Sequence, residues 1–155
     1  MKRGYVLILV FSLTISAFSQ LKKAKMDNEW MGEILNEICR EVKGQSGYWE
    51  ADYLGRKMMI ITDEQNNRMR IIAPISEQKK VKSKMLLEAM EANFDQVLDA
   101  KYALYNDVVW AVFVHPLGEL AEEQFKDAMS QVFVAANTFG TSYRSTNLVF
   151  GGGDK

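Results

Sequence analysis

The sequence predicts an α+β fold in which three helices accompany an antiparallel sheet of about five strands, in the order α-β-β-β-α-β-β-α. Two observations lead to this prediction. Three segments repeat apolar side chains at the 3.6-residue period of a helix, and five shorter segments are rich in strand-forming residues. The connections between successive strands are too short for crossovers, so we expect neighbouring strands to be antiparallel.

The first helix is predicted over residues 27–43, where Asp27 or Asn28 can cap its start and Gly44 ends it. Its apolar side chains recur at helical spacing: Trp30, Met31, Ile34, Leu35, Ile38 and Val42. Three strands follow, over residues 48–53, 58–62 and 69–75. Pro74 places the end of the third strand at an edge of the sheet or at its exit, because proline donates no ladder hydrogen bond.

The second helix is predicted over residues 81–98. Its charged side chains form a narrow stripe, and the remaining arc of roughly 240° is wider than a helix with one covered face needs. We expect the bulky side chains of this arc to face the core: Leu86, Leu87, Met90, Phe94, Val97 and Leu98. The smaller flank, formed by Met85, Ala89 and Ala92, is expected to meet another helix, either in the chain or in a partner.

The last two strands, over residues 100–105 and 108–115, are predicted to form a hairpin across the turn Asn106-Asp107. The second of them is apolar on both faces, which is typical of a strand covered on both sides. We therefore expect both faces of the sheet to be covered, with a partner able to supply part of the cover. A third helix is predicted over residues 120–139.

The start of the chain is typical of an export signal. Lys2 and Arg3 precede an apolar run over residues 6–15, and the small residues Ala17 and Ser19 fit the rule for signal cleavage. The apolar run is shorter than the roughly 20 residues that a membrane-spanning helix needs. The sequence therefore predicts a cleaved signal peptide and a periplasmic or secreted protein.

Length and composition indicate one ordinary globular domain. The chain has 155 residues, of which 48% are hydrophobic and 25% charged, which excludes a disordered or disulfide-dense chain. We interpret residues 1–19 as the signal peptide, 20–140 as a single domain and 141–155 as a polar, mobile tail. Without the signal, 17 basic side chains stand against 20 acidic ones, a net charge of −3. This balance argues against a nucleic-acid partner, which requires a basic face.

Catalytic and ligand-binding motifs are missing from the sequence. It contains no phosphate-binding loop, no nucleophile elbow and no zinc-binding spacing, so we predict no cofactor and no metal. His115 could act as a base with Glu119, and Cys39 could act as a nucleophile, but neither has an identifiable catalytic partner. We expect both to be structural. A small periplasmic enzyme using His115 or Cys39, or a small-ligand carrier, stays an alternative.

Two aromatic residues of the first predicted strand are candidate protein contacts. Trp49 and Tyr53 share one face of that strand, and aromatic side chains are common anchors of interfaces. A sheet packed under a helix explains the same pattern. With the small flank of the second helix, they complete the predicted contact set: Met85, Ala89, Ala92, Trp49 and Tyr53.

Three segments of the chain resemble a known superfamily. They are Met85-Leu86-Leu87-Glu88-Ala89-Met90-Glu91-Ala92-Asn93-Phe94, the hairpin Lys101-Tyr102-Ala103-Leu104 with Val109-Trp110-Ala111-Val112, and Leu117 with Leu120-Ala121-Glu122-Glu123-Gln124-Phe125. In this pattern the chain is similar to the type III secretion chaperone-like superfamily, and within it to the bacterial sensory-transduction-regulator (YbjN-type) branch. The resemblance implies an α+β fold, often a homodimer, a protein partner and no catalysis. We therefore expect a non-enzymatic, exported protein-binding module.

Overall fold

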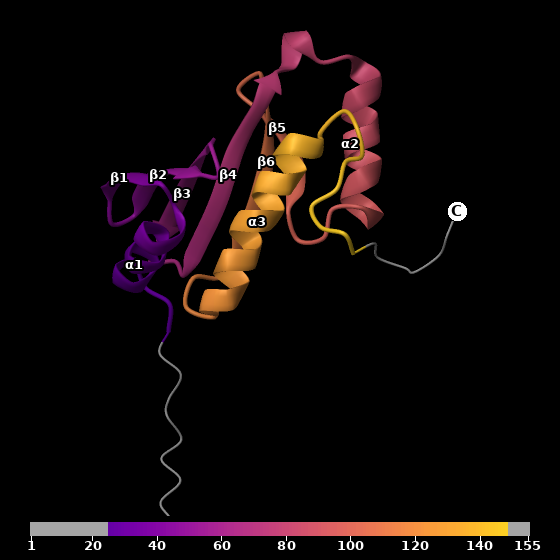
Figure 1. Cartoon of the computed structure of the whole chain (residues 1–155). Coiled ribbons are helices and arrows are strands. Elements are labelled where there is room, and N and C mark those ends of the chain that lie inside the picture. Colours follow the sequence, from indigo (N-terminus) through magenta and orange to yellow (C-terminus); the bar gives the residue numbers. More distant parts are fainter. Residues whose placement is uncertain (1–24, 149–155) are drawn as a thin grey trace, which may run out of the picture.

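The computed structural model describes residues 25–148, and it confirms the predicted α+β fold class (Figure 1). Within these residues the chain forms three α-helices, six strands and one short 3₁₀ helix. The elements are α1 (Asn28–Ile38), β1 (Glu41–Gln45), β2 (Tyr48–Tyr53), β3 (Arg56–Asp63), β4 (Arg68–Glu77), η1 (Gln78–Lys80), α2 (Ser83–Asp95), β5 (Lys101–Tyr105), β6 (Val108–His115) and α3 (Glu122–Thr138). The strands form one antiparallel sheet in the order β1-β2-β3-β4-β6-β5.

The additional strand arises where the first helix ends early. α1 begins as predicted, because the Asp27 carboxylate accepts a hydrogen bond from the Trp30 backbone N–H at 2.9 Å and so caps the helix. The helix ends at Ile38, so the prediction that it continues to residue 43 is wrong. Cys39 has an extended backbone, and residues Glu41–Gln45 pair with β2 as the edge strand β1.

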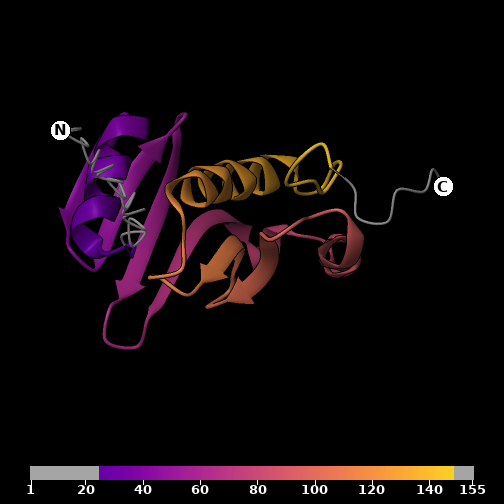
Figure 2. The same cartoon turned by 90° about the horizontal axis from the view of Figure 1, so that it is seen from below.

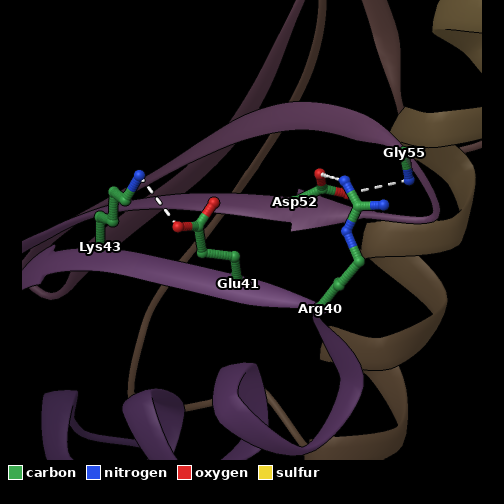
Figure 3. Close-up of polar contacts among 5 residues, drawn as sticks. All are labelled: Arg40, Glu41, Lys43, Asp52 and Gly55. Atoms are coloured by element: carbon green, nitrogen blue, oxygen red, sulfur yellow. Dashed lines mark hydrogen bonds and ion pairs between the residues drawn. The ribbon is translucent and has the colours of Figure 1, made fainter.

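Charged side chains lie along the β1 edge of the sheet (Figure 3). Arg40 forms an ion pair with Asp52, whose other carboxylate oxygen accepts a hydrogen bond from the Gly55 backbone N–H at 2.9 Å. Lys43 and Glu41 form a second ion pair along β1, with 2.9 Å between Nζ and Oε1. Charges on an edge strand oppose unwanted pairing with a strand of another molecule.

Pro74 lies inside β4 and not at its end, although the physical reason for the prediction holds. β4 is an interior strand between β3 and β6, but its pairing with β3 ends at Ile72. The register with β6 also shifts between Pro74 and Ser76. Proline is therefore accommodated where β4 has no partner on one side and a bulge on the other.

Two helices cover one face of the sheet and create the core. α3 packs on β4 and β6, and α1 packs near β1, both on the same side (Figure 2). The strand side chains on this side are buried: Trp49, Ala51, Met58, Ile60, Met69, Ile71, Ala73, Tyr102, Val109, Ala111 and Phe113. All of them except Val109 belong to one core cluster with the apolar stripe of α3, formed by Phe125, Ala128, Met129, Val132, Ala135 and Ala136. The third helix, α2, stands beside β5 at the end of the sheet (Figure 1).

The segment after α3 returns toward α2 and holds the two helices together (Figure 1). Tyr143 is buried, and its ring packs edge-on against the rings of Tyr102 and Phe139. Its hydroxyl donates a hydrogen bond to Glu88 Oε2 on α2 at 2.9 Å. This segment therefore links α2 to the covered face of the sheet.

The predicted tail of residues 141–155 contacts the domain in its first part. Ser145 is buried, and its Oγ accepts a hydrogen bond from the Leu98 backbone N–H at 2.7 Å. Residues 149–155 and the predicted signal peptide, residues 1–19, lie outside the described residues.

Candidate protein-contact surfaces

The sheet face opposite the helices carries an apolar patch that no described residue covers. The patch, which we call the open face, consists of half-buried or exposed side chains of β3, β4 and β6: Met59, Ile61, Ile72, Trp110, Val112 and Val114. It is continuous, since Ile72 lies directly opposite Met59 on one side and Val112 on the other. We expected both faces of the sheet to be covered, but within the described residues the chain covers only the face under α1 and α3.

Positive charge lies within and beside the open face. Arg70 is exposed on β4 between Ile61 and Val114, and it takes part in no ion pair within the described residues. Lys57 is exposed one strand away, opposite Asp52. An apolar surface of this kind marks an interaction site more often than it occurs by chance on a monomeric protein.

A second apolar surface lies on α2, and it is formed by side chains that we predicted for the core. The exposed fractions of Leu87, Met90 and Phe94 are 62%, 70% and 91%. The prediction that the bulky side of α2 faces the core is wrong for these three residues. We call them the α2 ridge, because their spacing places them along one line of the helix.

Large rings under α2 explain why its small side faces inward. Ala89 and Ala92 are buried, whereas the bulkier side chains point away from the domain. Tyr143 donates a hydrogen bond to Glu88, and Tyr102 lines the same groove as Ala89, so both rings lie close to the helix. Only small side chains fit between these rings and the helix backbone at interior packing density.

Beside the α2 ridge an apolar groove separates α2 from β5. Its volume is about 240 Å³, and its lining is Leu86, Ala89, Met90, Tyr102, Ala103, Leu104 and Val109. Leu104 and Tyr105 on β5 are themselves 50% and 68% exposed. This space is a surface groove and not the internal cavity that a small-ligand carrier would need.

The residues predicted to contact a partner are mostly buried or half-buried against other parts of the chain itself. On α2, Ala89 and Ala92 are buried and Met85 is half-buried. On β2, Trp49 is buried, and Tyr53 is half-buried with its ring edge-on to Phe133 at 5.7 Å between centroids. Whether any of them contacts a partner is not tested by the structure and stays a prediction.

His115 is held by its own neighbours at the end of β6. Its ring stacks on Phe113, and its Nδ1 donates a hydrogen bond to the Pro116 carbonyl at 2.7 Å. Glu119, its expected partner, instead accepts from Asn67 Nδ2 at 2.7 Å, and this hydrogen bond is the main reason why the pKa of Glu119 is lowered.

An open cleft of about 300 Å³ adjoins His115. It is lined by Leu98, Asp99, Lys101, Phe113, Val114, His115, Gln124 and Asp127. The cleft contains acidic side chains, but it has no serine, threonine or cysteine among its lining residues that could serve as a nucleophile for His115. Asp99 and Asp127 both accept hydrogen bonds from Gln131 Nε2, at 3.3 and 2.7 Å, which gives them a structural role.

Cys39 is a poor candidate nucleophile. The side chain is half-buried, and burial, followed by the negative charge of Asp52, raises its pKa to about 11. A reactive cysteine needs the opposite shift, because the thiolate is the nucleophile. The geometry therefore gives no support to a thiol enzyme.

Residues 25–148 contain neither a clustered set of metal ligands nor a helix that could span a membrane. No group of three or more histidine, cysteine or acidic side chains in this range could hold a metal ion. None of the helices in the same range is both long and apolar enough to span a bilayer.

Comparisons with known proteins find similarity at the level of fold. No protein-family model matches the chain, and no curated protein matches its sequence. The solved structures that are similar to the chain include two protein complexes. One is a chain of the HopA1–SchA chaperone–effector complex, with a TM-score of 0.55 and 12% identity over 72% of this chain and 94% of that chain.

The other is a chain of the complex between the Yersinia pestis type III secretion chaperone SycH and a stable fragment of YscM2. Its TM-score is 0.56 at 12% identity, and the match covers 73% of this chain and 98% of that chain. The chain therefore has the fold of type III secretion chaperones, as the sequence resemblance predicted. The narrower assignment to the YbjN-type branch stays a prediction.

Proposed function

We propose that this protein is an exported, non-enzymatic protein-binding module that assembles as a homodimer. The observation that carries the proposal is the open face, a continuous apolar patch that nothing in the described chain covers. Exposing such a patch to water costs roughly 25 cal/mol of free energy for each Å² of apolar surface. A protein partner that covers the patch recovers this free energy.

The comparisons support the proposal, because both similar structures are complexes in which a chaperone is bound to another protein. The surroundings of His115 and Cys39 give no comparable support to the alternative of a small enzyme. The periplasmic or secreted location rests on the N-terminal sequence. Fractionation of the producing cells and mass spectrometry of the purified protein test it, with Gln20 expected as the first residue.

Crosslinking and affinity capture from the envelope and culture fractions test the binding role. We expect the wild-type chain to capture a defined protein, and Val114→Glu to lose it, since a carboxylate on this apolar face loses its hydrating water when a partner docks. Leu54→Glu is the matched control, because Leu54 is 69% exposed in the turn between β2 and β3, away from the open face.

Circular dichroism must show that both variants are folded. Equal capture by the wild type, Val114→Glu and Leu54→Glu would show that the open face is not the binding site. Failure of the wild type to capture any protein reproducibly would contradict the proposed binding role.

A further inference from the structure

The first part of α2, residues 83–92, is tied to the sheet only through the segments before and after it. Before it, the Gln78 backbone N–H donates to the Asp107 carbonyl in the turn between β5 and β6, at 2.7 Å. After it, the Asn93 side chain donates to the Tyr102 carbonyl at 3.1 Å and accepts from the Tyr102 backbone N–H at 2.8 Å. Between these two attachments, no hydrogen bond within the described residues connects α2 to a strand.

This part of α2 also stands over open space. Leu86 lines a hollow of about 600 Å³ between the start of α2 and the β5–β6 turn. It also lines the apolar groove of about 240 Å³ beside β5, together with Ala89 and Met90. A helix that spans two hollows gives up few packing contacts when it leaves its position, because its side chains have few partner atoms there. The sheet therefore does little to hold this part of the helix in place.

Residues 139–148, which we call the strap, supply the contacts that the sheet does not. The strap leaves the end of α3 and runs beside α2 (Figure 1). The Tyr143 hydroxyl donates to Glu88 Oε2 at 2.9 Å and lies 3.3 Å from the Met85 carbonyl oxygen. The Met85 side chain reaches the backbone of Gly140, where a Cβ would lie 2.5 Å from its terminal carbon. These contacts all lie in the first part of α2, so the strap clamps the part that the sheet leaves free.

The backbone of the strap is strained at the residue that makes most of these contacts. The φ of Tyr143 is +49°, in the left-handed region that residues with a Cβ rarely adopt. Such a conformation persists only where the surrounding structure fixes it, so release of the strap relieves the strain. The Tyr102 ring, against which Tyr143 packs, stays in place without the strap, because its hydroxyl donates to the Ala135 carbonyl of α3 at 3.0 Å.

We propose that the strap is a latch for α2: when it releases, residues 83–92 unwind while the sheet, α1 and α3 stay folded. A detached helical segment of this length is unstable in water, because packing supplies most of the stability of a helix in a protein. The groove beside β5 then loses one wall, and Leu87 and Met90 lose their place on the α2 ridge. The latch thus controls whether the surface on α2 exists, and it does so independently of the open face.

The unwinding is expected to stop at Asn93. Besides the two hydrogen bonds between Asn93 and Tyr102, the end of α2 is held by Lys101, whose Nζ donates to three carbonyl oxygens there at 2.7 to 3.0 Å. These contacts come from β5 and do not involve the strap. The latch therefore divides α2 into a part that opens and an end that stays on β5.

Native-state hydrogen exchange, followed by NMR on the purified protein at one concentration, tests the latch. The amides of residues 87–91 report on the part that opens, since each donates to a carbonyl four residues earlier in the same part. We expect their protection factors to be at least roughly tenfold lower than those of the β3 amides. The Tyr102 amide, which donates to Asn93, reports on the end that stays on β5, and we expect it to be better protected than residues 87–91.

Two substitutions of similar cost separate local opening from global unfolding. Tyr143→Phe removes the hydrogen bond to Glu88, and we expect residues 87–91 to exchange about fivefold faster, the effect of one hydrogen bond. Ile60→Val removes one buried methyl group of β3, so the sheet amides should exchange about fivefold faster while residues 87–91 keep their rates. The two sets differ because Ile60 stays buried when the strap opens. Ser142→Ala, an exposed neighbour of Tyr143, is the control for the strap and should change neither set.

Three results would contradict the latch. If Ile60→Val accelerates residues 87–91 as much as the sheet, α2 opens only when the whole fold unfolds. Unchanged rates at residues 87–91 in Tyr143→Phe would show that the strap does not hold the helix. Exchange of the Tyr102 amide as fast as residues 87–91 would show that β5 does not retain the end of α2. None of these measurements involves capture at the open face, so this inference and the proposed function are tested separately.

Discussion

The C-terminal end of α2 depends on a cation that a strand supplies. α2 has no basic residue in its own last turn. Lys101, the first residue of β5, donates from Nζ to three carbonyl oxygens at distances of 2.7 to 3.0 Å, those of Asn93, Val97 and Leu98. We predict that Lys101→Met, which keeps the apolar stem of the side chain, destabilises the protein mainly through this loss.

The expected magnitude follows from the contacts. A hydrogen bond to a charged group contributes about 1.5 to 3 kcal/mol, and a cation at the negative end of a helix contributes about 0.3 to 1 kcal/mol. The three bonds of one ammonium group are not additive, and water can replace part of them at this partly buried site. We therefore expect Lys101→Met to lower the free energy of unfolding by about 2 kcal/mol.

Urea denaturation at one fixed protein concentration measures this loss. Lys84→Met is the matched control on the same helix. Its side chain is 83% exposed and reaches Glu88 only at 3.6 Å, so we expect a change within about 0.5 kcal/mol. A loss for Lys101→Met no larger than the loss for Lys84→Met would refute the assigned role of Lys101.

Three further predictions concern single side chains. Tyr143→Phe should cost about 1 kcal/mol, since it loses the hydrogen bond to Glu88. Burial and then this hydrogen bond raise the pKa of Tyr143 from 10.0 to about 12. The protonated hydroxyl therefore stabilises the fold fully below pH 10, and this contribution is lost as the pH rises from 10 to 12. In denaturation experiments the loss of stability over this range should be smaller for Tyr143→Phe, which has no hydroxyl to titrate. The raised pKa of Cys39, about 11, predicts slow alkylation by iodoacetamide at pH 8 that accelerates toward pH 11, and rapid reaction at pH 8 would contradict it. Gly44→Ala should destabilise the fold by about 3 kcal/mol or more, because the φ of Gly44 is +114° and a Cβ would lie 2.3 Å from the Tyr48 carbonyl oxygen. Gly55 is the control, because its φ is +87° but a Cβ there would meet nothing within 4 Å. Gly55→Ala should therefore cost only about 1 to 2 kcal/mol in the same denaturation assay.

The sequence predicted the order of the elements well but placed one boundary wrongly. Ile38 and Val42 are four residues apart, a spacing that fits one face of a helix. In the structure Val42 belongs to β1 and lies opposite Ala51, on the covered face of the sheet. A single apolar residue satisfies both patterns, so periodicity alone could not separate the last turn of a helix from a short edge strand.

The orientation of α2 could not be predicted for a related reason. The sequence shows how wide the apolar arc of the helix is, but the side that faces inward depends on what fills the space below it. Tyr102 and Tyr143, which lie 41 residues apart in the chain, occupy that space together. Only the tertiary structure brings them to the alanine flank, and the width of the arc was the one available signal that part of it would stay exposed.

β6 shows why the excess of apolar residues points to binding and not to folding. Its odd-numbered residues Val109, Ala111 and Phe113 are buried on the covered face of the sheet, whereas Val112 is half-buried and Val114 is 55% exposed on the open face. Replacing Phe113 with alanine should therefore cost about 3 to 5 kcal/mol, and replacing Val114 with threonine less than about 0.5 kcal/mol. The open face then contributes little to the stability of the isolated domain, so the free energy available from covering it is left for a partner. Comparable losses for Phe113→Ala and Val114→Thr in urea denaturation would mean that the open face is already covered in solution by part of the chain itself.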